Sequence, residues 1–176
     1  MYGKIESESA AGVNMLDKDG YRLNVGIVLL DSSLKQVFWG RRKGESSWQF
    51  PQGGVYEDEE LQDAMFRELN EELGLSAHHV EIIARTQELL YYDVPVVYQY
   101  HRSNTIYRGQ KQIWYLLKFV GRDHQINVRY HKEQEFDAWR WTEYWVPLED
   151  VIEFKRGVYE SALNELAAHL HHKPAK

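Results

Sequence analysis

GGVYEDEELQDAMFRELNEELGL, residues 53–75, joins a glycine-containing turn to a segment with the periodicity of a helix. From about residue 59 to residue 73, apolar side chains recur every three or four positions: Leu61, Ala64, Met65, Leu69 and Leu73. This spacing predicts an amphipathic helix with one buried face. Gly74 follows directly and is suited to end the helix, because glycine adopts the left-handed backbone conformation without steric cost.

Three glutamates of this segment, Glu68, Glu71 and Glu72, stand at helical positions i, i+3 and i+4. At about 100° per residue they share one surface, within an arc of about 100° that also holds apolar residues. An acidic helix face is often only a solvated surface with ion pairs, and spacing alone leaves that alternative open. Like charges beside an apolar face repel one another and lose solvation, however. A hard cation such as Mg²⁺ or Mn²⁺ relieves both costs.

Gly53, Glu59 and residues 67–75 (RELNEELGL) resemble the complete Nudix box, which Gly74 and an aliphatic residue close. The resemblance implies an α/β fold, a Nudix-type α/β/α sandwich with a mixed sheet between helices. It implies hydrolysis of a nucleoside diphosphate linked to another group. The implied cofactor is Mg²⁺, for which Mn²⁺ or another divalent cation can substitute. In this pattern Glu59 would brace the loop against the helix.

The same resemblance implies roles for residues within and beside the box. The metal ligands would be Glu68, Glu71 and Glu72. Arg67 would orient these glutamates, and the turn at Gln52 would offer a backbone carbonyl to a metal.

The chemistry of phosphoanhydrides is consistent with these roles. Adjacent negative oxygens repel an incoming nucleophile, so metals must neutralise charge, orient the substrate and supply a water of lowered pKa. A carboxylate then removes the proton. We expect Glu68 or Glu135 to be this base, and the sequence does not choose between them.

Sequence outside the box is similar to the bacterial RNA pyrophosphohydrolase family, from about residue 20 to residue 170. The similar segments are residues 19–26, 48–54, 109–114, 135–141 and 154–159. Members of that family remove pyrophosphate from the 5′ end of RNA and so initiate mRNA decay, and relatives cleave dinucleoside polyphosphates such as diadenosine tetraphosphate. The expected partner is therefore 5′-triphosphorylated RNA or, as the alternative, a dinucleoside polyphosphate. No protein partner is indicated.

Five residues outside the box are expected to bind substrate or metal. Arg42 and Phe154 resemble the family pair that sandwiches a base. Arg22 and Lys155 are the best candidates to meet phosphates, and Glu135 resembles an additional metal-binding or catalytic glutamate. Each has a structural alternative: a core residue for Phe154, a solvated strand end for Arg42, a surface position for Glu135, and a merely solvated side chain for Arg22 or Lys155.

One segment departs from the family pattern. Where a basic loop is expected, the chain has Asp93-Val94-Pro95-Val96-Val97. This weakens the case for tight binding of RNA, since phosphate contacts dominate nucleic-acid affinity.

A noncatalytic Nudix-fold module that senses nucleotides is a further alternative, against which the intact box argues.

Patterning outside the box predicts most of the remaining elements. We expect strands at 23–30, 36–41, 80–90, 112–120 and 135–145, a surface loop over 91–110 and an amphipathic helix over 154–170. Residues 1–14 are predicted to be a flexible extension or a cloning remnant. Residues 15–170 are predicted to form a single domain, and 171–176 a flexible tail.

Composition excludes several classes of site. The 176 residues include no cysteine, which excludes disulfides and thiolate ligands or nucleophiles. The net charge of −6 does not exclude a polyanionic substrate, because bound cations can make an acidic site attractive to phosphate. No apolar run reaches the roughly 20 residues of a membrane-spanning helix, and no signal peptide is evident, so we expect a cytoplasmic protein.

Overall fold

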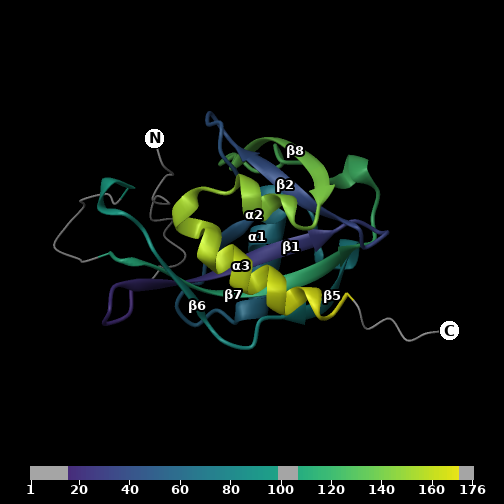
Figure 1. Ribbon diagram of the computed structural model, residues 1–176. Coiled ribbons are helices and arrows are strands. Elements are labelled where there is room, and N and C mark those ends of the chain that lie inside the picture. Colours follow the sequence, from purple (N-terminus) through teal and green to yellow (C-terminus); the bar gives the residue numbers. More distant parts are fainter. Residues whose placement is uncertain (1–15, 99–106, 171–176) are drawn as a thin grey trace.

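The protein's computed structural model describes residues 16–98 and 107–170, which form a mixed sheet with helices on both faces (Figure 1). The strands are β1 (Tyr21–Leu30), β2 (Gln36–Arg42), β3 (Trp48–Gln49), β4 (Gln52–Gly54), β5 (Val80–Arg85), β6 (Leu90–Asp93), β7 (Gly109–Phe119) and β8 (Phe136–Glu143). The helices are α1 (Leu61–Leu73), α2 (Val146–Asp150) and α3 (Glu153–Ala167). Short 3₁₀ turns lie at Ala77–His79, Val96–Tyr98 and Asp123–Gln125.

The sheet is built around the parallel pair β1 and β7. Its order is β3-β2-β1-β7-β5, while β4 pairs with β1, β6 with β7, and β8 with β2. Every other pairing is antiparallel among the described strands. The edge of β1 therefore serves two partners, because Val25 lies opposite Gly53 of β4 whereas Leu30 lies opposite Val37 of β2.

Alternation along β1 produces two cores, one on each face of the sheet. Val25, Ile27 and Leu29 pack with the apolar face of α1, whereas Val28 and Leu30 pack with α3. In Figure 1, α1 and α3 lie on opposite sides of the sheet. This arrangement confirms the predicted α/β/α sandwich with a mixed sheet between helices.

Helix α1 confirms the prediction from residues 53–75. It starts at Leu61, two residues later than expected, and its predicted apolar positions Ala64, Met65, Leu69 and Leu73 are fully buried. Gly74 ends the helix with φ 69°, and its N–H donates to the Asn70 carbonyl.

Two expectations for the segment after Val80 were wrong. The single strand expected over 80–90 is two strands, because Thr86 leaves the β5 ladder and binds the backbone of Trp114 through both its N–H and its hydroxyl. The loop expected over 91–110 begins as strand β6 instead, with Tyr92 opposite Gln110 of β7. Residues 99–106 of that loop lie outside the described residues.

Some predictions are not tested by the described structure. The flexible extension at 1–14 and the tail at 171–176 lie outside the described residues, and the single domain over 15–170 stays a prediction. Among the described helices, none is long and apolar enough to cross a membrane.

Replacing Gly74 with alanine should destabilise the fold by about 1–2 kcal/mol, the typical cost of a left-handed conformation for a residue with a Cβ. The added Cβ would also lie 3.0 Å from the Tyr130 Cβ. Urea unfolding measures the change. Gly157→Ala is the matched control, since Gly157 lies inside α3 with nothing near its Cβ position. That variant should gain roughly 0.5–1 kcal/mol. Equal effects of the two alanines would contradict the assigned helix end.

Candidate functional site

The turn before α1 brings backbone directly against a buried carboxylate. A Cβ built on Gly53 would overlap the carboxyl group of Glu68, so only glycine fits at this position. Glu68 is 2% exposed, although its side chain ends in a carboxyl group. The turn and the first acidic residue of the predicted metal set are therefore packed together.

Arg67 compensates the buried negative charge. Its guanidinium donates to both oxygens of Glu59 (2.9 Å each), to Glu68 Oε1 (2.7 Å) and to the Gly54 carbonyl (2.6 Å). It lies 3.4 Å from Glu71 Oε2. One side chain thus joins the turn, the loop before α1 and the helix itself, while the roles implied for Arg67 and Glu59 stay predictions.

The charge states of this group are fixed by mutual contact. Burial by itself would lower the pKa of Arg67, but the carboxylates of Glu59 and Glu68 outweigh burial and raise that pKa. Burial likewise works to raise the pKa of Glu59, while the Arg67 hydrogen bonds lower it below its ordinary value. Both groups are therefore charged at neutral pH, and the contact is a charge-assisted pair.

The predicted metal ligands share one helical turn but do not converge. Glu68 and Glu72 are buried, and the Glu71 side chain is 33% exposed. Within residues 16–98 and 107–170, no three acidic or histidine side chains lie close enough to hold a metal ion as they stand. In this arrangement Arg67 contacts both Glu68 and Glu71. The donor chemistry nevertheless fits a hard cation, which prefers carboxylate oxygens.

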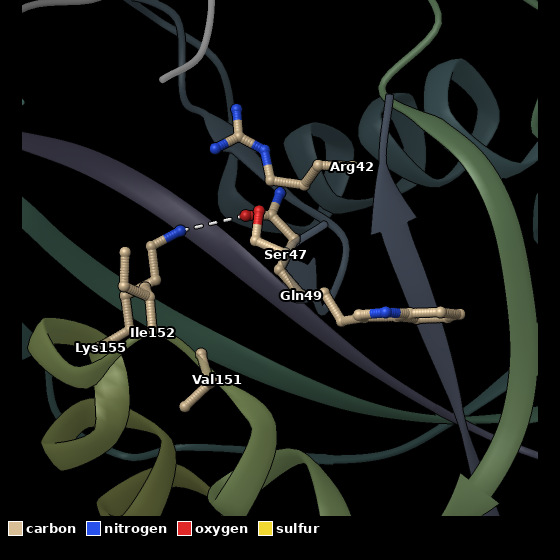
Figure 2. Close-up of a pocket in the computed structure, with 7 residues that line it drawn as sticks. Arg42, Ser47, Gln49, Val151, Ile152 and Lys155 are labelled. Carbon is tan, nitrogen blue, oxygen red and sulfur yellow. Dashed lines mark hydrogen bonds between the residues drawn. The ribbon is translucent and has the colours of Figure 1, made fainter. Parts of the chain in front are cut away.

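A second polar cluster joins β2, β3 and α3. The Gln49 amide donates to Glu135 Oε1 (3.3 Å) and accepts from Lys155 Nζ (3.1 Å). Arg42 Nε lies 3.5 Å from the same Glu135 oxygen and pairs at the same distance with Glu45. Figure 2 shows the Lys155 amine reaching from α3 toward the Gln49 amide, with the Arg42 guanidinium close by.

These side chains border a shallow pocket at the start of α3. Its lining consists of Arg42, Ser47, Trp48, Gln49, Val151, Ile152 and Lys155 (Figure 2). The pocket therefore places two cationic side chains, Arg42 and Lys155, beside the apolar side chains of Val151 and Ile152.

Lys155 is a cation buried within the protein, with 6% of its surface exposed. Burial and the neighbouring Arg42 lower its pKa to about 8, while Glu135, Glu45 and Glu72 act in the opposite direction. Because Glu72 and Glu135 both act on Lys155, the acidic end of α1 and the pocket face a common region.

The remaining predicted substrate residues, Phe154 and Arg22, lie on the α3 side of the sheet. The half-buried Phe154 ring packs against Tyr98 (5.5 Å between ring centres) and Tyr92 (6.1 Å). Arg22 stands over the Tyr107 ring at 5.5 Å. Phe154 and Arg42 flank Lys155, but the base sandwich between them stays a prediction.

The segment that departs from the family pattern is tied down at its acidic end. The Asp93 carboxylate accepts from the Tyr21 hydroxyl (2.5 Å) and from Arg108 Nε (3.2 Å). Val96 and Val97 follow with 65% and 84% of their surface exposed. Among the described residues 93–98, the segment is thus largely apolar, and the Asp93 carboxylate is paired.

Sequence reasoning missed two residues that the structure places at the site. Gln49 bridges Glu135 and Lys155. The sequence feature that could have identified it is a polar residue between the aromatic Trp48 and Phe50 in an extended segment. Tyr92 is 7% exposed and packs on Phe154, but it lay in a segment interpreted as loop.

Without added metal, the free energy of unfolding of the wild type should rise relative to that of the Lys155→Met variant as pH increases from about 8 towards 10.5. The folded pKa of Lys155 is about 8 against 10.5 for the free side chain, so the unfolded chain binds the extra proton in this window. Urea unfolding of both proteins near the two ends of the window measures the difference. Parallel pH profiles would contradict the buried position of the amine.

Comparisons with known proteins agree with this geometry. A family model described as the NUDIX domain matches residues 20–166. The Ap4A hydrolase of C. elegans, as a binary complex, is 18% identical with a TM-score of 0.61, over 84% of this chain and 96% of that chain. The dihydroneopterin triphosphate pyrophosphohydrolase of E. coli is 17% identical with a TM-score of 0.61, over 81% and 95%.

The MutT protein of Methanosarcina mazei Go1 is 17% identical with a TM-score of 0.57, over 84% of this chain and 95% of that chain. At such identities the solved structures show the shared fold, while the family model covers most of the chain. The intact box, the sandwich and this match agree: the chain belongs to the Nudix family and is a hydrolase that acts on phosphoanhydride bonds.

Proposed function

We propose that this protein is an RNA 5′ pyrophosphohydrolase, which removes pyrophosphate from 5′-triphosphorylated RNA and so initiates mRNA decay in the cytoplasm. The observation that carries the proposal is the position of Lys155. This buried cation lies within electrostatic range of Glu72 and Glu135 and follows the Phe154 ring directly in α3. A polyphosphate at Lys155 therefore adjoins both the acidic residues and a stacking surface.

Arg22 supports a substrate longer than one nucleotide. Arg22 of β1 lies opposite Gln110 of β7, which in turn lies opposite Tyr92 of β6. The even-numbered residues of β1 face α3, so Arg22 lies on the α3 side of the sheet. Tyr92 packs against Phe154. A second cation therefore lies beyond the aromatic ring from the Lys155 pocket, at a place suited to a phosphodiester of the following nucleotide.

The candidate metal ligands are Glu68, Glu71 and Glu72 with the Gln52 carbonyl and Glu135. A bound Mg²⁺ would neutralise phosphate charge and supply a water of lowered pKa. Arg67 compensates the charge of Glu59 and Glu68, and Lys155 and Arg42 would hold the substrate phosphates. Access supports Glu135 rather than Glu68 as the base that takes the proton, since the Glu135 side chain is 37% exposed and that of Glu68 is 2% exposed.

Hydrolysis of dinucleoside polyphosphates is the second candidate. The exposed Val96 and Val97 beside Tyr98 favour it, because an apolar and aromatic rim suits a second base better than an RNA backbone. The same acidic and cationic residues would serve both reactions.

Purified protein with Mg²⁺ is incubated separately with 5′-triphosphorylated RNA and with diadenosine tetraphosphate, and initial rates are compared. We expect pyrophosphate release from RNA at a higher kcat/KM. Absence of release from RNA, with turnover of diadenosine tetraphosphate, would replace the first candidate with the second.

Glu72→Gln should lower kcat by about 100-fold or more while the thermal unfolding midpoint hardly changes. Loss of groups that merely support metal ligands already costs about 10–100-fold, so loss of a ligand should cost at least as much. Glu57→Gln is the matched control, since it removes one exposed carboxylate from the loop that precedes α1. Wild-type turnover by Glu72→Gln would defeat the metal assignment.

A further inference from the structure

A hydrogen-bonded network crosses the α3-facing side of the sheet. Trp114 Nε1 donates to Gln112 Oε1 (3.1 Å), and Gln112 Nε2 donates to Asn24 Oδ1 (2.7 Å) and Gln52 Oε1 (3.3 Å). The Gln52 side chain in turn acts on Tyr92, where it works to lower the pKa of the hydroxyl against the raising effect of burial. We call these five residues the Gln112 network.

The network lies in a place where apolar residues would pack without difficulty. Gln112 and Trp114 are 0% exposed and Asn24 is 3% exposed. Their neighbours on the same face, Val28 and Leu116, belong to the apolar core against α3. Buried amides stabilise a core no better than apolar groups of similar size, and they are costly if any member loses its partner. Packing alone therefore does not account for an amide at position 112.

The amide orientations give the network a direction. Because Gln52 Oε1 accepts from Gln112, the amino group of Gln52 is the donor that this amide has left on the side of Tyr92, whose pKa it works to lower. The network thus starts at Trp114, whose indole lies against Gly26 in the core, and ends at Tyr92. Four strands, β1, β4, β6 and β7, contribute one or more of its members.

Two members of the network, Gln52 and Tyr92, lie at different parts of the candidate site. Gln52 precedes Gly53, the residue whose backbone packs on the Glu68 carboxyl. Tyr92 packs on Phe154 at 6.1 Å, and Lys155 Nζ lies 5.9 Å from the centre of the Tyr92 ring. A single amide in the core therefore contacts the side chain that joins the acidic loop to the aromatic and cationic pocket.

We propose that Gln112 is a positioning residue. Through Gln52 it fixes the turn at Gly53 relative to the Tyr92 hydroxyl, so that the acidic residues near Gly53 and the aromatic residues near Tyr92 act on the same substrate. Gln112 itself touches neither substrate nor metal. The proposal rests on the proposed function, because it concerns the alignment of that site.

A double-mutant cycle tests this coupling. Gln112→Leu removes every bond of the central amide, and Tyr92→Phe removes only the terminal hydroxyl. We expect Gln112→Leu to lower kcat/KM by roughly 10–100-fold, as loss of supporting groups around an active site does. The double variant should match Gln112→Leu within about threefold, because the hydroxyl has already lost its positioned partner. If the double variant loses kcat/KM by the product of the two single-variant losses, the proposal is overturned.

Thr86→Val is the matched control for a purely structural loss. Thr86 is 0% exposed, and its hydroxyl accepts from the backbone N–H of Trp114, so the variant removes a buried hydrogen bond beside the network but not within it. We expect Thr86→Val to lower the thermal unfolding midpoint. Its kcat/KM should stay within about twofold of the wild type, because Thr86 shares no hydrogen bond with the amides of the Gln112 network. A loss of kcat/KM in Thr86→Val equal to that in Gln112→Leu would contradict the positioning role.

If Gln112→Leu does not fold, Gln52→Met replaces it in the cycle. That variant removes the bridging amide from a half-buried position and keeps the backbone carbonyl. Full activity of Gln52→Met would overturn the proposal. A wild-type protein that hydrolyses neither RNA nor diadenosine tetraphosphate would refute the proposed function instead. An active wild type with unaffected variants refutes only the role of Gln112.

Discussion

The contact between the Arg67 guanidinium and its carboxylates is the interaction on which the site depends. Arg67 holds Glu59 through two hydrogen bonds, Glu68 through one and the Gly54 carbonyl through another. Without this cation, Glu68 would be a buried charge of the kind that proteins tolerate only when it is compensated. The turn, the loop before α1 and α1 itself are therefore joined through one side chain.

The acidic end of α1 and the pocket beside α3 are complementary in charge. Glu72 and Glu135 favour the charged form of Lys155, while burial and Arg42 oppose it. A polyphosphate that entered this region would add negative charge beside Lys155 and Arg42, and a cation would add positive charge beside Glu72 and Glu135. An overall acidic chain can therefore bind a polyanion, as the sequence allowed.

The parts that were predictable from sequence depend on local periodicity. The α1 helix, its end at Gly74 and the burial of Glu68 and Glu72 follow from spacing along one helix. Strand β6 could not be recognised, because the tyrosines of 91–92 become a strand only by pairing with β7. The bond between Gln49 and Lys155 joins residues 106 positions apart, and the spread of the glutamates depends on how Arg67 distributes its bonds.

The central claim is that the Glu68, Glu71 and Glu72 carboxylates, released in part from Arg67, assemble the metal site of this hydrolase. The most direct test is a crystal structure of the wild type with Mn²⁺ and a nonhydrolysable triphosphorylated dinucleotide, with the metal located by its anomalous scattering. The account predicts a metal peak bound by these glutamates beside Gly53, with the phosphates at Lys155. A peak elsewhere, or phosphates bound with Arg67 still holding Glu68 and Glu71 and no metal beside them, would contradict it.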